Sequence, residues 1–258
     1  MNKLNTYTST GIKLIFHPTV VEKIINQRKA SPISLQIAPT SKCNLKCCFC
    51  SNVNREKHEE LPFDKIVEFL RSMRKLGAKT VEWTGGGDPT MYPYINQCIE
   101  EADNIGFEQG LITNGILLYR KIEQENLDKL KWLRVSMNCL DYVKTVSVPS
   151  IKGTLGFSYV MNDMTNIDVI NNLDAHVKKY KPKYVRIVPN CQVSAERQEY
   201  NNKVFEQIVG SWGAPYFYQR KEFKRPKNCW FCYLKPFLLH DGFIYPCSSV
   251  VLNDDADR

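Results

Sequence analysis

Short apolar segments and helix-like segments alternate between residues 33 and 190, and this alternation limits the fold more than any other feature. In the clearest helix-like segment, residues 63–76, apolar side chains recur on one face before Gly77. Such alternation predicts parallel βαβ units, arranged either as an open doubly wound sheet or as an incomplete barrel. The six expected strands cover residues 33–38, 80–83, 107–113, 132–137, 155–160 and 184–189. The expected helices cover residues 63–76, 94–105, 122–130 and 167–180.

The sequence pattern changes after residue 190. Residues 204–209 are expected to form a short helix, and the remaining sequence is aromatic, basic and rich in turn residues. Residues 237–245, interrupted by Asp241 and Gly242, predict a β-hairpin. We therefore expect an N-terminal extension over residues 1–32, an α/β unit over residues 33–190 and a small appended module over residues 191–258.

Composition excludes two classes of protein. The chain is 43% hydrophobic and 24% charged, which is typical of globular proteins and not of disordered ones. It contains no apolar run of the roughly 18 residues that a membrane helix needs. The first ten residues are polar and lack the apolar core of a secretory signal. We therefore expect a soluble, cytoplasmic protein with no membrane partner.

Seven of the ten cysteines fall into two groups, which indicates metal or redox chemistry in preference to disulfides. In the first group, Cys43, Cys47 and Cys50 lie on one loop, where three thiolates can converge on a zinc ion or an iron–sulfur cluster. Zinc requires a fourth ligand, for which His58 is the nearest candidate. Three cysteines fit better with a [4Fe-4S] cluster that leaves one iron open. Cys48 lies outside this spacing.

The spacing Cys43-x3-Cys47-x2-Cys50, with the aromatic Phe49 before the third cysteine, resembles the signature of the radical S-adenosylmethionine (SAM) superfamily. This resemblance implies a partial (β/α)6 barrel and a [4Fe-4S] cluster whose open iron binds SAM. It also implies an enzyme that reductively cleaves SAM to a 5′-deoxyadenosyl radical, which abstracts hydrogen from a substrate. A reductant such as flavodoxin or ferredoxin would supply the electron. SAM is expected at the carboxyl ends of the strands.

Residues at the ends of later strands extend the resemblance. Gly85, Gly86, Gly87 and Asp88 follow the second strand and resemble the family's Gly-Gly-Glu-Pro segment, which holds the methionine end of SAM. Glycine allows backbone to approach a ligand closely. This sequence departs from the pattern because Asp88 stands where glutamate is usual. Four further residues occupy positions where relatives contact SAM, namely Asn114, Ser136, Asn138 and Arg186.

The second cysteine group has the spacing Cys229-x2-Cys232-x14-Cys247. It resembles the start of a SPASM or twitch module, which holds an auxiliary [4Fe-4S] cluster near the substrate. A zinc ribbon is the alternative. Three cysteines leave the fourth ligand of an auxiliary cluster open, and Cys191, the substrate or a non-cysteine site could complete it.

The substrate is not selected by these motifs, and a small anionic molecule, a nucleotide and a peptide all remain candidates. The net charge of +8 favours anionic partners, although a solvated basic face accounts for it equally well. A rival interpretation is a zinc-stabilised nucleic-acid-binding protein without catalytic activity, which would use the basic C-terminal segment and the aromatic residues 230, 231 and 233. The glycine-rich segment at residues 85–89 favours the enzyme, because a zinc module does not need it.

Overall fold

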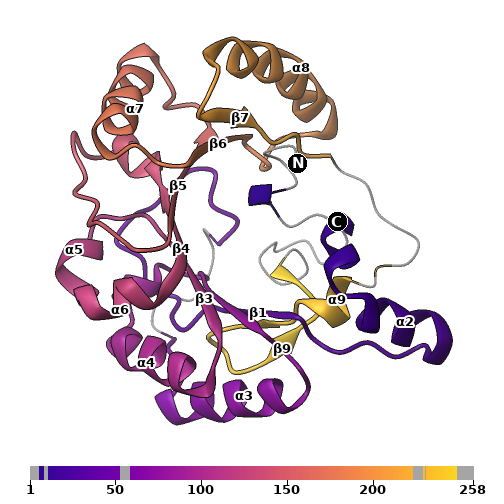
Figure 1. Cartoon of the computed structure of the whole chain (residues 1–258). Coiled ribbons are helices and arrows are strands. Elements are labelled where there is room, and N and C mark those ends of the chain that lie inside the picture. Colours follow the sequence, from indigo (N-terminus) through magenta and orange to yellow (C-terminus); the bar gives the residue numbers. More distant parts are fainter. Residues whose placement is uncertain (1–5, 9–10, 53–58, 223–228, 230, 249–258) are drawn as a thin grey trace.

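One strongly curved sheet organises the chain in the computed structural model, which describes residues 6–8, 11–52, 59–222, 229 and 231–248 (Figure 1). Nine described strands follow the order β7-β6-β5-β4-β3-β2-β1-β8-β9, and all neighbours are parallel except β8 and β9. The strands are β1 (Ser34–Ile37), β2 (Thr80–Trp83), β3 (Glu108–Thr113), β4 (Leu130–Ser136), β5 (Thr154–Met161), β6 (Tyr184–Pro189), β7 (Tyr216–Tyr218), β8 (Phe237–Leu238) and β9 (Ile244–Tyr245). The predicted parallel α/β architecture with an incomplete barrel is therefore confirmed.

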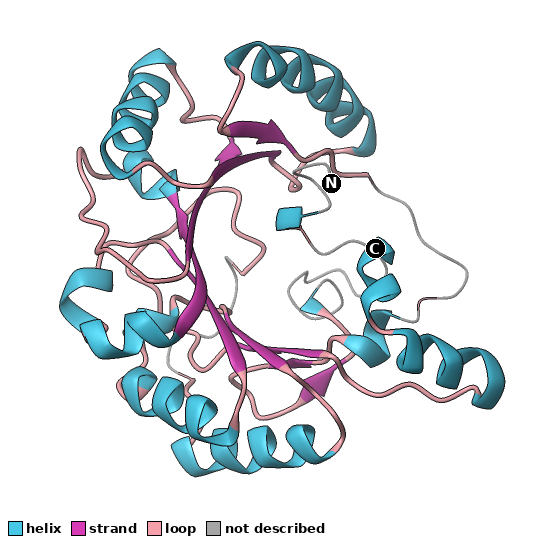
Figure 2. Cartoon of the chain, viewed as in Figure 1, coloured by secondary structure: helices cyan, strands magenta, loops and turns pink. Residues whose placement is uncertain are grey.

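Helices cover the outer face of this sheet and leave one side of the barrel open (Figure 2). The described α-helices are α2 (Pro18–Gln27), α3 (Phe63–Lys75), α4 (Ile95–Ile105), α5 (Leu118–Lys121), α6 (Gln124–Lys129), α7 (Ile167–Tyr180), α8 (Ala195–Trp212) and α9 (Phe231–Leu234). Of these, α2 and α9 lie at the open side of the barrel (Figure 1). Short 3-10 helices cover Gly11–Phe16, Pro89–Met91 and Met137–Asp141. Within the described residues, no helix is both long and apolar enough to cross a membrane.

The two faces of the sheet differ in chemistry. Along β1 and β2, Leu35 and Trp83 belong to the positions that are buried in the apolar core. Successive strand residues point to opposite faces, so the alternate positions line the inside of the barrel. These alternate positions include Gln36, Glu82 and Arg134. The core therefore lies between sheet and helices, while the barrel interior is polar.

The segment after β6 differs from the sequence prediction. The helix expected at residues 204–209 is present but longer than predicted, because α8 runs from Ala195 to Trp212 and leads into β7, which pairs in parallel with β6. Ser194 begins this helix by accepting a hydrogen bond from the Arg197 N–H at 3.2 Å. The predicted hairpin at residues 237–245 is confirmed as β8 and β9, and β8 joins the sheet beside β1.

Polar residues on the buried face of α8 explain why apolar periodicity did not reveal its length. Asn202 is fully buried, donates to the carbonyl of Lys221 at 2.7 Å and accepts from the Tyr218 hydroxyl at 2.9 Å. Gln198, one turn earlier, is also buried and donates to the same carbonyl at 3.5 Å. The helix is thus attached to the edge of the sheet by hydrogen bonds from Gln198 and Asn202. In most amphipathic helices these buried positions are apolar.

We predict that Asn202→Leu destabilises the protein although it restores the expected apolar pattern. The substitution removes the acceptor of the half-buried Tyr218 hydroxyl and of the Lys221 N–H, and one of the two donors to the Lys221 carbonyl, which costs about 2–3 kcal/mol of unfolding free energy. Urea denaturation followed by circular dichroism measures this loss. Lys203→Leu, at the adjacent exposed position, is the matched control and should change the midpoint little. Equal midpoints for the two variants would contradict the assigned role of Asn202.

Candidate functional site

Two loops meet at the carboxyl ends of β1 and β2. The cysteine loop (residues 40–52) follows β1, and the glycine loop (residues 85–88) follows β2. The N–H of Gly87 donates to the carbonyl of Thr40 at 2.9 Å, and the N–H of Asp88 donates to the carbonyl of Lys42 at 2.8 Å. A side chain at Gly87 would overlap the Lys42 carbonyl, so only glycine permits this approach. The two loops are therefore held together by their backbones.

The carboxylate of Asp88 lies at the centre of this arrangement and is only 3% exposed. Its Oδ1 accepts from the backbone N–H of Thr90 at 2.9 Å, the Thr90 hydroxyl at 2.6 Å and the Thr113 hydroxyl at 2.9 Å. Its Oδ2 accepts from the N–H of Asn114 at 2.7 Å, with the Thr113 hydroxyl at 3.0 Å. A carboxylate has about four lone-pair sites, and these contacts use them. Asp88 therefore fixes the end of β3 against the glycine loop.

Asn114 extends the same connection to the cysteine loop. Its amide donates to Asn44 Oδ1 at 2.7 Å and lies 3.8 Å from the sulfur of Cys43. Its own Oδ1 accepts from the N–H of Ile116 at 3.0 Å, which fixes the orientation of the amide. Three strand ends that are distant in sequence are thus joined around Cys43.

The three cysteines expected to bind metal interact electrostatically within the cysteine loop. Burial, together with the neighbouring Cys50 and Cys43, raises the pKa of the Cys47 thiol to about 12. The N–H of Cys50 donates to the carbonyl of Cys47 at 3.0 Å, which forms a tight turn. Cys48 is exposed, and its thiol lies 4.0 Å from Asn162 Oδ1, beyond the end of β5. Phe49 is half-buried within the same turn.

The chemistry of these donors fits an iron–sulfur cluster. Cys43, Cys47 and Cys50 are not joined in disulfides, and a cationic metal centre relieves the mutual repulsion of neighbouring thiolates. In the described part of the chain, no three His, Cys, Asp or Glu side chains already stand in a metal-binding arrangement. The loop therefore offers the set of thiol donors that such a cluster needs.

The other expected cofactor-binding residues have different surroundings. Asn138 is buried, donates to Asp141 Oδ2 at 3.0 Å and to the Val160 carbonyl at 2.9 Å, and accepts from the Val160 N–H at 2.7 Å. It therefore joins the end of β4 to β5. Ser136 is half-buried at the last position of β4. Arg186 lies on the inner face of β6, where it donates to Gln219 at 3.1 Å.

Sequence reasoning missed the contribution of His240 in the β8–β9 hairpin. Its ring lies against Gly86, where any side chain would collide with it. Its Nδ1 is 2.7 Å from Glu59 Oε2, and the N–H of Glu59 donates to the Ser41 hydroxyl at 3.0 Å. The hairpin thereby supports both the glycine loop and the start of the cysteine loop. No spacing in the sequence identifies this contact, because the partners lie in three separate segments.

The second cysteine group is only partly described. Cys229 is exposed and Cys247 is half-buried, whereas the side chain of Cys232 lies outside the described residues, as does His58. Cys191 follows β6 directly, is exposed and donates from its thiol to the Pro189 carbonyl at 3.7 Å. The auxiliary cluster and its fourth ligand therefore remain predictions.

Comparison with known proteins identifies a family for part of the chain. The model of the Radical SAM superfamily matches residues 37–145, a range that contains the cysteine loop, the glycine loop and Asn114. This family uses a [4Fe-4S] cluster and SAM.

Curated relatives include two kinds of enzyme. The chain is 24% identical over 187 residues to the S-adenosylmethionine-dependent nucleotide dehydratase of Lacinutrix mariniflava, a match that covers 63% of this chain and 38% of that protein. It is 34% identical over 115 residues to the probable GTP 3',8-cyclase of Archaeoglobus fulgidus, covering 43% of this chain and 37% of that protein. The chain thus spans less than half the length of these two relatives. It is 24% identical over 257 residues to the GTP 3',8-cyclase of Clostridium botulinum, covering 83% of this chain and 80% of that protein.

Solved structures share the fold. Streptococcus suis SuiB bound to the precursor peptide SuiA superposes with a TM-score of 0.62 at 17% identity, covering 98% of this chain and 70% of that one. The structure of anSMEcpe with bound AdoMet (SAM) and the Kp18Cys peptide superposes with a TM-score of 0.55 at 16% identity, covering 85% and 75% respectively. At this identity the likeness establishes the architecture alone.

We predict that Asp88→Ala lowers the melting temperature by about 6–12 °C. The substitution leaves the N–H groups of Thr90 and Asn114 without their acceptor, and a loss of about 3 kcal/mol corresponds to a shift of this size in a chain of this length. Differential scanning calorimetry under anaerobic conditions measures the effect.

The control for this variant is Asp103→Ala, which removes an exposed carboxylate from α4 and should leave the melting temperature within about 2 °C of the wild-type value. If the melting temperature of Asp88→Ala equalled that of this control, the carboxylate would not be the connection between the strand ends.

Proposed function

Residues 37–145 form a radical SAM domain, and from this premise we propose that the chain is an enzyme that abstracts hydrogen from its substrate by radical chemistry. A [4Fe-4S] cluster held by Cys43, Cys47 and Cys50 would pass one electron, supplied by a reductant such as flavodoxin or ferredoxin, to bound SAM, and this chemistry would give methionine and a 5′-deoxyadenosyl radical. The protein contributes position and electrostatics to this chemistry.

The observation that carries the proposal is the junction of three strand ends around Cys43. Cys43, Cys47 and Cys50 would hold the cluster on a loop that is fixed to the glycine loop by two backbone hydrogen bonds. Gly85 and Gly86 offer backbone at the same edge of the sheet, which suits the methionine end of SAM. Parallel α/β sheets place their ligands at this edge.

Asp88 would act on SAM through the loop that it positions. Both carboxylate oxygens are occupied by hydrogen bonds from the chain, so its contribution is to hold the glycine loop against β3. Asn138 has the corresponding role between β4 and β5. Asn114 would likewise act through the cysteine loop, because its amide donates to Asn44. Ser136 is the remaining polar side chain at this edge that we assign to the cofactor.

For the substrate, we propose a small anionic molecule in preference to a peptide. The relatives named above include a nucleotide dehydratase and GTP cyclases, while SuiB was solved with a precursor peptide. The polar, basic interior of the barrel supports the anionic class. An auxiliary cluster on Cys229, Cys232 and Cys247 belongs to the same proposal and would lie near the substrate.

Anaerobically reconstituted protein with a strong reductant should convert SAM to 5′-deoxyadenosine, and Cys43→Ala, Cys47→Ala and Cys50→Ala should each abolish this product. Loss of one thiolate removes a ligand that the chain cannot replace locally. Chromatography of the nucleoside product, together with iron and zinc analysis, measures the effect.

Cys48→Ala is the matched control, because this exposed thiol lies outside the ligand spacing within the same loop. The control should retain both iron and product formation. The cluster assignment fails if Cys48→Ala loses its iron while Cys47→Ala keeps it. Zinc without iron in the wild-type protein would favour the zinc-stabilised binding protein.

A further inference from the structure

A central cavity of about 1100 Å³ lies on the inner face of the curved sheet. Alternate residues of β1 to β6 line it, and Tyr7 of the N-terminal segment stacks on Tyr184 at its wall, with ring centroids 4.2 Å apart. At one end the lining reaches Thr84, the residue before the glycine loop. The cavity therefore extends from the candidate cofactor edge into the barrel, and its volume suits an organic ligand.

The described lining of this cavity carries an excess of positive charge, with eight Lys and Arg side chains and two Glu side chains. The inner carboxylate, Glu82, is already paired, because Lys235 lies 3.2 Å from it and Gln36 donates to it at 2.6 Å. Burial would raise the pKa of Glu82, but Lys235 and the hydrogen bond from Gln36 outweigh burial and lower it. Glu82 is therefore paired with Lys235, and its charge also favours the charged forms of Arg134 and Arg186, so one inner carboxylate serves several cations.

Arg186 on β6 is the least compensated of these cations. One of its terminal nitrogens donates to Gln219 at 3.1 Å, and its buried Nε has no hydrogen-bond partner among the described residues. Burial, followed by the like charge of Arg134, lowers the pKa of Arg186 to about 9. A buried donor without an acceptor is unfavourable, and a buried charge requires compensation. An anion in the cavity would supply the missing acceptor and the compensating charge.

Two further cations face the same region. Arg134 donates only to neutral oxygens in the described structure, the Tyr184 hydroxyl at 3.0 Å and the Tyr7 carbonyl at 2.9 Å. Burial, followed by the charge of Arg186, lowers the pKa of Lys221. The positive charges of Arg134, Arg186 and Lys221 therefore repel one another. A bound anion would offset this repulsion.

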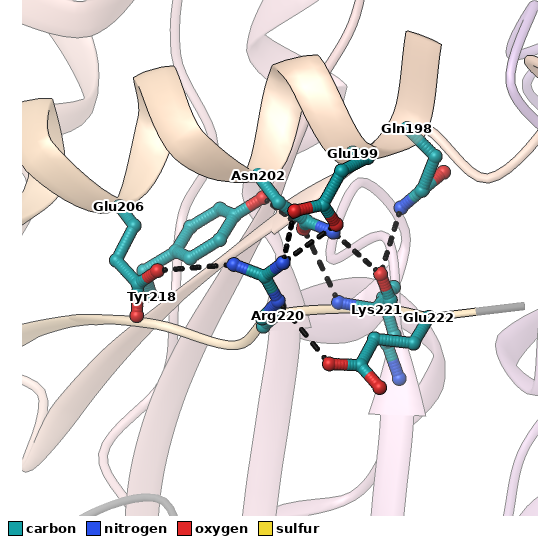
Figure 3. Close-up of polar contacts among 8 residues, drawn as sticks. All are labelled: Gln198, Glu199, Asn202, Glu206, Tyr218, Arg220, Lys221 and Glu222. Atoms are coloured by element: carbon teal, nitrogen blue, oxygen red, sulfur yellow. Dashed lines mark hydrogen bonds and ion pairs between the residues drawn. The ribbon is translucent and has the colours of Figure 1, made fainter. Parts of the chain in front are cut away.

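Arg220 and Lys221 are neighbours in the sequence but differ in their polar contacts (Figure 3). Arg220 contacts Glu199, Glu206 and Glu222, whereas among the residues drawn no contact reaches the ammonium group of Lys221. The backbone of Lys221 is fixed by Asn202, as described above. Carboxylates therefore neutralise the outward-facing cation and leave the inward-facing one available.

From this geometry we propose that the central cavity binds the phosphate of a phosphorylated small molecule through Arg186, Arg134 and Lys221. Three cations around one site match a multiply charged anion better than a single carboxylate, and guanidinium groups bind phosphate oxygens in pairs. The inference rests on the proposed function in one respect: the phosphate is part of the substrate, whose reacting end then extends past Thr84 towards the cysteine loop.

The test uses the full chain, anaerobically purified with its iron, and inorganic pyrophosphate as the probe in isothermal titration calorimetry without SAM. Wild-type protein should bind pyrophosphate, and Arg186→Gln and Lys221→Gln should each weaken binding roughly tenfold to a hundredfold. Pyrophosphate should also raise the melting temperature of the wild-type protein, because it binds only the folded state.

Arg120→Gln is the matched control, since it removes one positive charge from an exposed position on α5. It should bind pyrophosphate as the wild-type protein does. The proposal is overturned if the wild-type protein does not bind pyrophosphate at millimolar concentration, or if Lys221→Gln and Arg186→Gln bind as tightly as Arg120→Gln. If Arg186→Gln does not fold, Lys221→Gln alone decides the outcome.

This binding measurement is independent of SAM cleavage, so the two proposals fail separately. Pyrophosphate binding in the cavity without formation of 5′-deoxyadenosine would overturn the proposed function and leave the anion site supported. Formation of 5′-deoxyadenosine by a protein that does not bind pyrophosphate would overturn the anion site and leave the proposed function supported.

Discussion

The buried carboxylate of Asp88 is the interaction on which the candidate site depends. It accepts hydrogen bonds from Thr90 within its own loop and from Thr113 and Asn114 at the end of the neighbouring strand. Asn114, oriented in this way, reaches Asn44 and Cys43 in the cysteine loop. Asp88 thus sets the relative positions of three loops. It holds the backbone of Thr90 and Asn114 directly, and Asn114 in turn holds Asn44 in the cysteine loop.

The sequence predicts the strands well for a physical reason. In a sheet covered by helices on one face, every second residue must be apolar, and Leu35 and Trp83 show this pattern. It predicts α8 poorly, because Gln198 and Asn202 replace apolar residues on the buried face and form hydrogen bonds to the sheet edge. Polar residues in such positions are indistinguishable from surface residues until their partners are known.

The same distinction applies to the candidate site. The cysteine spacing and the glycine run are local, so the sequence alone identifies them as motifs. The hydrogen bonds from Thr113 and Asn114 to Asp88 and the contact between His240 and Gly86 are not local, since they join segments 25 or more residues apart. Sequence reasoning therefore assigned Asp88 to the cofactor directly, whereas the structure shows its oxygens bonded to the chain.

The groups suited to the cofactor and the groups suited to an anion lie in different parts of the barrel. A complete eight-stranded barrel fills its centre with packed apolar side chains, whereas this open sheet leaves a cavity whose inner strands carry Glu82, Arg134 and Arg186. The loops at the carboxyl edge present thiols and backbone, which suit a metal centre and its bound cofactor. The inner face presents cations, which suit an anion. Because Thr84 belongs to the cavity wall and Gly85 begins the glycine loop, the two regions share one strand end. A ligand held by the inner cations would therefore lie in a cavity that reaches the cofactor edge along the same sheet.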